Sequence, residues 1–159
     1  MEISEKEFER IVRQNKSTIY TVCYMFADNA DDADDLFQEV LVNIWNGLGQ
    51  FRQSSDISTW IWRVSLNTCI SNDRKRKRRH TVRLTMEANL YEDNDDDTRQ
   101  IRMLRDRIHR LKPFDRAIVL LWLENLSYEE IGDIVGITAK NVSVRLFRIR
   151  RELKQMSNN

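Results

Sequence analysis

The chain has 159 residues, and its 26 Lys and Arg residues nearly cancel its 25 Asp and Glu residues, giving a formal net charge of +1. One Pro and four Gly argue against a turn-rich all-β fold, and no apolar run approaches the ~20 residues needed to span a bilayer. We therefore expect a mostly helical, cytoplasmic protein with no direct membrane insertion, in which Cys23 and Cys69 are buried and reduced.

The small net charge hides a division of the chain into four blocks of opposite sign. Residues 1–60 carry a net charge of −6, residues 61–84 carry +7, residues 85–98 carry −6 and residues 99–159 carry +6. A chain sorted in this way is better suited to polyanions and charged partners than an evenly mixed one.

The first two expected helices are marked by their ends and by apolar spacing. The first begins at a capping box formed by Ser4 and Glu7, and apolar residues then recur every three or four positions as far as Phe26. The second begins at the acidic turn 31–35, where the helix macrodipole favours negative charge, and ends at Gly47 or Gly49.

The third expected helix leads into a dense basic run. It follows a polar loop at residues 50–58, begins near Thr59 with Trp60 facing inward, and continues into six consecutive basic residues at 74–79. Trp62 stands among these cations as an exposed aromatic. Rings and cations together suit single-stranded or locally melted nucleic acid, because bases stack on rings while Lys and Arg follow phosphates. A solvated basic tail is the alternative for the same residues.

An abrupt change of composition separates the two halves of the chain. Residues 85–98 hold six carboxylates, no basic residue and no apolar period, so they cannot bury enough surface to offset the entropy of ordering them. The sequence therefore predicts an all-α fold of two small helical domains, residues 1–80 and 99–155, joined by a flexible acidic linker at 81–98.

Two helices are expected at the start of the second domain. Apolar residues repeat at three and four positions from Ile101 to Leu111, and Pro113 ends that helix. Residues 114–125 form the second, strongly apolar helix.

Residues 127–151 carry the most specific local pattern. A capping box at Ser127 starts a short helix through Val135, Gly136 breaks it, and a basic amphipathic helix runs from about residue 139 to 155. This order is typical of a helix-turn-helix. Arg and Asn on the second helix are residue types that pair with guanine and adenine edges in the major groove.

Catalytic and metal-binding patterns are missing from the sequence. Neither His80 nor His109 has Cys or carboxylate partners at metal-ligand spacing, and the acidic cluster at 31–39 lacks the Gly and alternation of a calcium loop. No Gly-rich phosphate loop and no nucleophile beside a base is found. We expect no enzyme activity, metal or cofactor.

Taken together, these segments resemble the sigma-70 family of RNA polymerase sigma factors, and specifically its extracytoplasmic-function (ECF) group, which has only regions 2 and 4. The matching segments are Asp34–Val40 with Ile44 and Trp45 for region 2.2, Ser58–Val64 with Asn67 for regions 2.3 and 2.4, and 127–151 for region 4.2. The resemblance implies a three-to-four-helix bundle for region 2 and a helix-turn-helix domain for region 4. It also implies promoter-specific transcription initiation.

The resemblance further implies three sets of contact residues. Those expected to bind core polymerase are Asp35, Leu36, Gln38, Glu39, Leu41, Val42 and Trp45. Those expected to bind the −10 element are Arg52, Trp62, Arg63, Asn67, Arg74, Lys75, Arg76 and Arg78. Those expected to bind the −35 element are Lys140, Asn141, Ser143, Val144, Arg145 and Arg148. The loop 47–58 and Asn67 match the family's region that captures a flipped-out −10 base.

The implied partners are RNA polymerase core, through its beta-prime clamp and beta subunits, promoter DNA, and an anti-sigma factor, which is often membrane-anchored in this family. The residues alone leave two other interpretations open. One is a stand-alone helix-turn-helix regulator that binds duplex DNA without polymerase. The other is a single-strand nucleic-acid chaperone that uses the basic run without sequence preference.

Overall fold

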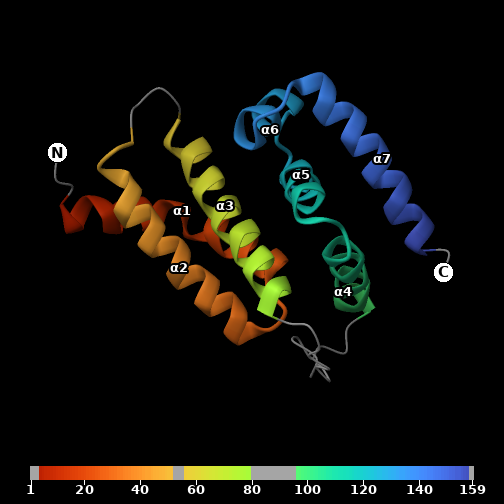
Figure 1. The fold of residues 1–159 in the computed structure, drawn as a ribbon, viewed down its shortest axis with the longest axis horizontal. Coiled ribbons are helices and arrows are strands. Elements are labelled where there is room, and N and C mark those ends of the chain that lie inside the picture. The colour runs from red at the N-terminus through yellow and green to blue at the C-terminus, as the bar shows by residue number, and fades with distance from the viewer. Residues whose placement is uncertain (1–3, 52–55, 80–95, 158–159) are drawn as a thin grey trace. The chain divides into compact units, whose positions relative to one another are not determined.

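A computed structural model describes residues 4–51, 56–79 and 96–157, with side chains for all of these except 76–79, 96–98 and 157. Every regular element in these residues is an α-helix, which confirms the predicted all-α class. The chain divides into two compact units, Met1–Thr85 and Met86–Asn159 (Figure 1). Most of the predicted linker lies outside the described residues.

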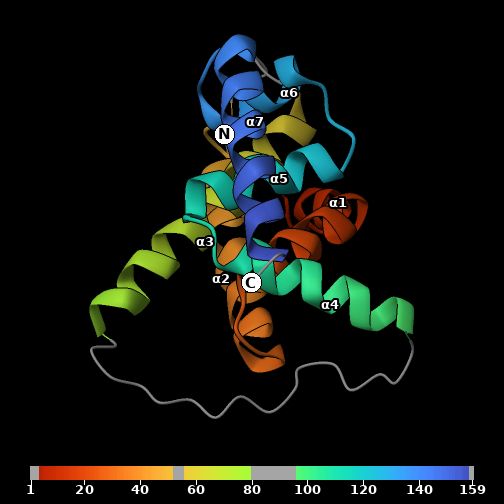
Figure 2. The same cartoon turned by 90° about the vertical axis from the view of Figure 1, so that its right-hand side faces the viewer.

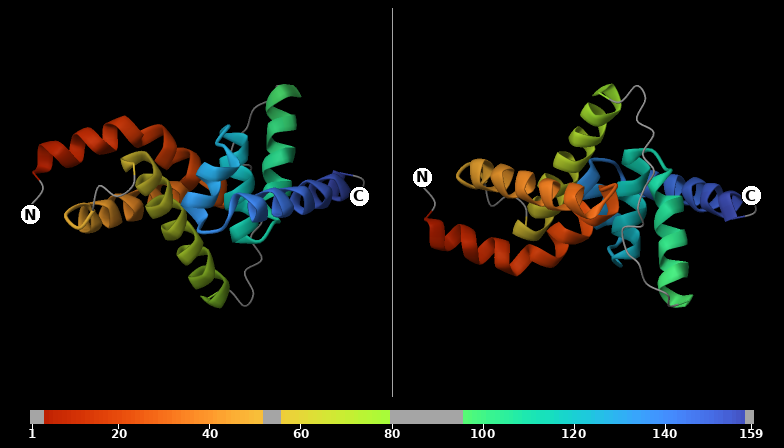
Figure 3. Two further views of the ribbon diagram at one scale, coloured as in Figure 1. Left: turned by 90° about the horizontal axis from the view of Figure 1, so that it is seen from above. Right: turned by 90° about the horizontal axis from the view of Figure 1, so that it is seen from below.

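The N-terminal unit is a bundle of three helices, α1 (Glu5–Phe26), α2 (Ala30–Leu48) and α3 (Ile57–Arg79). Each helix packs against the other two, and α1 lies alongside α2 (Figures 1 and 3). The buried apolar residues between the helices include Ile19, Val22, Cys23 and Phe26 of α1, Leu36, Val40, Ile44 and Leu48 of α2, and Ile61, Leu66 and Cys69 of α3.

The ends of the first helices follow the sequence signals. The Ser4 hydroxyl accepts a hydrogen bond of 3.2 Å from the Glu7 amide and so caps α1. The Asn29 side chain caps α2 by accepting a bond of 2.7 Å from the Asp32 amide. Asp31 and Asp32 then occupy the first turn of α2, where the positive end of the helix macrodipole favours carboxylates.

The C-terminal unit contains α4 (Asp96–His109), α5 (Pro113–Leu123), α6 (Tyr128–Val135) and α7 (Ala139–Ser157). Helix α7 packs on all three of the others and crosses α4 (Figures 2 and 3). The buried apolar residues of this unit include Ile108, Leu111, Ile118, Leu121, Ile131, Val142, Leu146 and Ile149.

Helix α4 begins at Asp96, inside the segment 81–98 that was predicted to be linker. Composition alone suggested a loop there, but acidic residue types are also favourable in the first turn of a helix. The other end of α4 is closed by Arg116 of α5, whose Nη2 donates to the carbonyl oxygens of His109 at 2.7 Å and Leu111 at 3.1 Å. A buried cation thus satisfies carbonyls that the helix end leaves unpaired.

The turn between α6 and α7 depends on two glycines. Gly136 ends α6 in the left-handed conformation, with φ 85°, which L residues other than Asn rarely adopt. Gly132 is buried in α6, and a Cβ built there would collide with the backbone carbonyl oxygen of Ile137. The turn can fold back this closely onto α6 only because Gly132 has no side chain.

Two absences concern the described residues only. None of their helices is long and apolar enough to cross a membrane. Their His, Cys, Asp and Glu side chains form no group of three or more that could hold a metal ion.

The two cysteines of the N-terminal unit are free and buried, as the sequence predicted. They come from α1 and α3, and the side chain of Cys23 is hydrogen-bonded to that of Cys69. This hydrogen bond, followed by burial, raises the pKa of the Cys69 thiol well above its ordinary value. The folded protein therefore retains a thiol proton that the unfolded chain releases more easily.

We expect the free energy of unfolding to fall as the pH rises above about 8.5, the usual pKa of a thiol in an unfolded chain. The raised pKa of Cys69 contributes stability below that pH and loses it as the pH climbs toward the folded-state value. Urea unfolding from pH 7.5 to 10 measures the effect. The parent should lose up to about 1.4 kcal/mol per pH unit more than Cys69→Ala. Parallel curves would contradict the expectation.

Gly132→Ala should destabilise the C-terminal unit by about 1–3 kcal/mol, because the added methyl collides with the Ile137 carbonyl oxygen in the turn between α6 and α7. Gly136→Asn is the matched control. It should cost less, since Asn tolerates a positive φ and no atom lies within 4 Å of the added Cβ. Thermal unfolding followed by circular dichroism compares the two variants. Equal melting temperatures for Gly132→Ala and the parent would show that the close approach is unimportant.

Candidate nucleic-acid and polymerase interfaces

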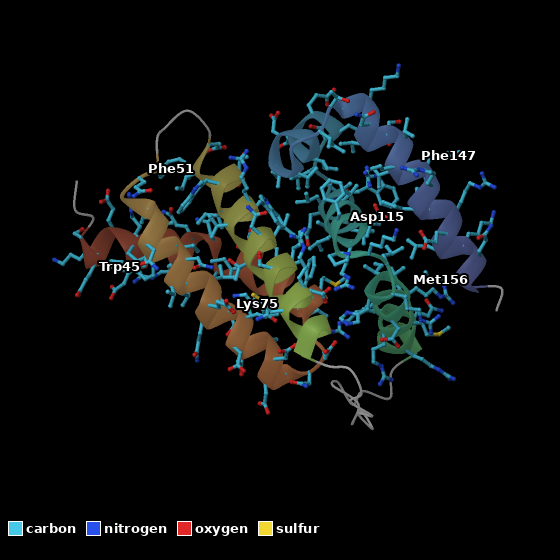
Figure 4. The ribbon with its side chains drawn as sticks, in the orientation of Figure 1. Trp45, Phe51, Lys75, Asp115, Phe147 and Met156 are labelled. Carbon is cyan, nitrogen blue, oxygen red and sulfur yellow. The ribbon has the colours of Figure 1, made fainter. Side chains whose placement is uncertain are left out.

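A groove of about 580 Å³ runs between α2 and α3. Its lining residues are Glu39, Asn43, Gly47, Gln50, Phe51, Trp60, Val64, Asn67, Thr68, Ser71 and Lys75. Phe51 lies near the end where the two helices join the loop, and Lys75 lies toward the other end of α3 (Figure 4). The groove therefore combines Asn67 with Gly47, Gln50 and Phe51, three residues of the loop 47–58 that was predicted to take part in base capture.

The loop end of the groove is aromatic. The rings of Phe51 and Trp60 have centroids 5.3 Å apart and are tilted by 46°. Trp60 is half-buried and lies directly on α2, because a Cβ on Gly47 would come within 3.0 Å of its ring. The inward-facing Trp60 predicted from the sequence is thus a wall of the groove rather than a fully buried core residue.

The middle of the groove is polar and ties the two helices together. The Asn43 amide donates to the Thr68 hydroxyl at 2.8 Å, and that hydroxyl donates to the Val64 carbonyl at 2.8 Å. Farther along, the Asn72 amide donates to the Glu39 carboxylate at 3.2 Å. Glu39, which the sequence assigned to the polymerase contact, is therefore also held by α3.

The predicted −10 residues are only partly gathered on the groove. Asn67 and Lys75 line it and are exposed, Arg74 is exposed beside it, and Arg63 is half-buried. Arg52 and the side chains of Arg76 and Arg78 lie outside the described residues.

Trp62 is only 7% exposed, so the prediction of an exposed aromatic at this position was wrong. The groove-lining residues of α3 recur at helical spacing and are Trp60, Val64, Asn67, Thr68, Ser71 and Lys75. Residues 61, 62, 65, 66 and 69 form the buried face, because α1 covers that side of α3. The sequence reasoning considered only one inward face, whereas α3 is covered on two.

The outer side of α2 carries most of the predicted polymerase-binding residues. Asp35 and Gln38 are exposed, Leu41 is half-buried, and Val42 and Trp45 are 56% and 46% exposed. The Trp45 ring makes an edge contact of 5.2 Å with Phe8 of α1. Its remaining surface faces outward from α2 (Figure 4).

Leu36 differs from the rest of this set, because it is only 2% exposed and belongs to the core. Its assignment as a direct polymerase contact conflicts with this burial. Leu36 instead helps to hold α2 against the neighbouring helices of the bundle.

The helix-turn-helix begins at a complete capping box. The Ser127 amide donates to the Glu130 carboxylate at 2.9 Å, and the Glu130 amide donates to the Ser127 hydroxyl at 3.1 Å. The hydrogen bond from the Ser127 backbone is the largest cause that lowers the pKa of the Glu130 carboxyl, and a hydrogen bond with the Ser127 side chain lowers it further. The predicted box and the break at Gly136 are confirmed.

The exposed face of α7 presents five of the six residues predicted to contact the −35 element, namely Lys140, Asn141, Ser143, Val144 and Arg148. The sequence reasoning missed Phe147, which is 64% exposed and labelled in Figure 4. Its place three residues after Val144 was the available signal. The Arg151 guanidinium lies 5.9 Å from the Phe147 ring centroid.

Arg145 is the exception on this helix. Its Nη1 lies 3.2 Å from the Asp115 carboxylate, and its guanidinium carbon lies 4.8 Å from the ring centroid of Phe114. Both partners belong to α5. Beside them is a hollow of about 250 Å³, also lined by Lys112 and Arg148.

Solved structures with this fold include CnrH in complex with the cytosolic domain of CnrY. The match has a TM-score of 0.70 at 19% identity and covers 98% of this chain and 90% of that one. The sigma factor RpoE in complex with the anti-sigma factor NepR from Bartonella quintana matches with a TM-score of 0.73 at 20% identity. That match covers 96% of this chain and 98% of the other.

Similar sequences include the ECF RNA polymerase sigma factor SigE of Mycolicibacterium smegmatis, which is 30% identical over 92% of this chain. The chain spans only 60% of that relative. The ECF RNA polymerase sigma factor SigW of Bacillus subtilis is 28% identical, over 93% of this chain and 87% of the relative.

Family models match most of the chain. Sigma-70 region 2 matches residues 11–79, which include the α2–α3 groove, and Sigma-70, region 4 matches residues 101–153, which include the helix-turn-helix. The chain belongs to the sigma-70 family, in its extracytoplasmic-function group of RNA polymerase sigma factors.

Proposed function

We propose that this sigma factor docks on RNA polymerase core with the outer side of α2, holds the −10 strand in the α2–α3 groove and reads the −35 duplex with α7. The observation that carries the proposal is the groove itself. It unites Asn67 with the aromatic residues Phe51 and Trp60 in one surface of about 580 Å³. Sites for small ligands commonly have volumes of about 300–1,000 Å³, so an unstacked nucleotide fits.

Docking on the core uses the acidic and apolar side of α2. Val42 and Trp45 of α2 leave about half of their surface uncovered, and apolar side chains exposed close together favour an interaction site. Asp35 stands on the same side and suits a basic partner surface. Aromatic anchors of this kind supply much of the binding energy at protein interfaces. The beta-prime clamp is the proposed partner.

The −10 contact combines stacking, hydrogen bonding and phosphate neutralisation. A flipped base stacks on Phe51 and Trp60 and pairs its edge with the Asn67 amide, while Arg74 and Lys75 meet the backbone. Stacking is worth about 1–3 kcal/mol per base, which offsets the few kcal/mol needed to unstack it. Capture of a base in the groove therefore favours the melted state of the promoter.

The −35 contact uses the exposed residues of α7. Lys140 and Arg148 meet phosphates or base edges, and the Asn141 amide can form two hydrogen bonds with adenine. The RpoE structure contains an anti-sigma factor bound to its sigma factor. We propose that this chain, too, is held inactive by an anti-sigma partner, in agreement with the expectation from the sequence.

Asp35→Lys with Val42→Lys should lower affinity for RNA polymerase core at least tenfold, because it places two cations on the surface proposed to meet a basic partner. Glu9→Lys with Gln14→Lys adds cations at exposed positions of α1 and is the matched control. Fluorescence anisotropy with labelled protein gives the affinity, and run-off transcription on promoters selected from genomic fragments gives the function. A parent protein that yields no transcript above core alone would refute the sigma assignment.

Asn67→Ala should reduce open-complex formation about tenfold on duplex promoters, since it removes the hydrogen bonds to the captured base. The loss should be smaller on templates already melted at −10. Asn46→Ala removes an exposed amide from α2 and is the control. Permanganate footprinting of the promoter measures opening. If Asn67→Ala and a change of the captured base give additive losses, Asn67 does not read that base.

A further inference from the structure

Arg145 lies on the −35 helix, yet its guanidinium is engaged within the protein. We propose that Asp115 and Phe114 of α5 are positioning residues that, by holding Arg145, fix the rotation of α7 and thereby set −35 specificity from outside the reading helix. The inference rests on the proposed −35 role of α7 and adds to it. It assigns part of the specificity to residues that need not touch a base.

Two contacts fix the position of the Arg145 guanidinium. The Arg145 Nη1 donates to the Asp115 carboxylate at 3.2 Å, and the guanidinium carbon lies over the Phe114 ring, 4.8 Å from its centroid. The two charged side chains are 39% and 20% exposed, so water screens their ion pair only in part. A planar guanidinium held by an acid and a ring has less freedom than a Lys ammonium would have.

The position of Arg145 on α7 allows the contact to restrain rotation of the helix about its axis. Val142, Leu146 and Ile149 bury the inner side of the helix, whereas Val144 and Arg148 stand on the exposed side. Apolar burial is non-directional, so it restrains rotation of the helix only through the close fit of the packed side chains. Readout of base edges tolerates errors of only about 0.5 Å and 10–20°. An ion pair at the edge of the buried face supplies the directional restraint.

Asp115 itself is held in place by its position in α5. Asp115 lies in the first turn of α5, directly after Pro113 and Phe114, where the macrodipole favours a carboxylate. Arg116, the next residue, is buried and closes the end of α4. Asp115 is thus attached to a rigid part of the unit, and α7 is positioned relative to α5 and α4 together.

Asp115 could act through its charge alone, and this electrostatic role predicts a different result from the positioning role. A carboxylate beside Lys112, Arg145 and Arg148 weakens the attraction of this surface for a polyanion. If charge were its whole role, Asp115→Asn would tighten binding to every −35 sequence alike. If Asp115 positions α7, the same substitution relaxes the preference for the best −35 sequence over mismatched ones.

The experiment uses holoenzyme assembled from core polymerase and the full chain. It selects from a promoter library with a fixed −10 element and a randomised −35 element. Asp115→Asn should lower the ratio of preferred to mismatched −35 sequences about five- to tenfold, and Arg145→Lys should relax the same base pairs. The double variant should be no worse than either single one. Asp106→Asn removes an exposed carboxylate from α4 and should leave the preference unchanged.

Phe114→Leu keeps the side chain apolar but removes the ring, and should relax the same base pairs to a smaller degree. Thermal unfolding shows whether Asp115→Asn folds. If it does not, Phe114→Leu and Arg145→Lys together test the proposal. The proposal is wrong if Asp115→Asn strengthens all sequences equally, or if the variants alter different base pairs. A parent holoenzyme with no −35 preference would instead refute the −35 role of α7 itself.

Discussion

The pairing of α2 with α3 is the constraint on which the N-terminal unit depends. Helix α3 must pack on α1 with one face and on α2 with another, so only a narrow strip remains for a ligand. Gly47 permits the closest approach by giving the Trp60 ring room against α2. The bond from Asn43 to Thr68 then fixes how the two helices lie along each other. The groove exists because these contacts hold its walls at a set separation.

This pairing also links the two proposed surfaces of the unit. Helix α2 carries Val42 and Trp45 on its outer side and contributes Asn43 and Glu39 to the groove. Because Glu39 accepts a hydrogen bond from Asn72, α2 cannot shift without changing the groove wall formed by α3. The proposed docking on polymerase and the proposed capture of a base therefore involve one packed pair of helices, not separate modules.

The sequence predicted the helices well, because apolar spacing and caps are local signals. The cap at Ser4, the capping box at Ser127 and the break at Gly136 lie where they were expected. The errors concern neighbours distant in the chain. Trp62 was expected on the surface and is buried, since periodicity could not show that α1 covers that side of α3. Leu36 was taken as a contact residue, although a docking helix also needs its own core.

Arg145 of α7 is a second case in which the sequence could not reveal a neighbour distant in the chain. Basic residues of α7 look equivalent in the sequence, and residue type alone assigns each of them to DNA. The partner that distinguishes Arg145 is Asp115, thirty positions upstream on another helix. A partner that stands 30 residues away leaves no local spacing signal, so only the packing of α5 on α7 reveals it. On the proposal made for Asp115, the specificity of this helix-turn-helix is a property of the unit that holds its second helix, as well as of the residues on that helix.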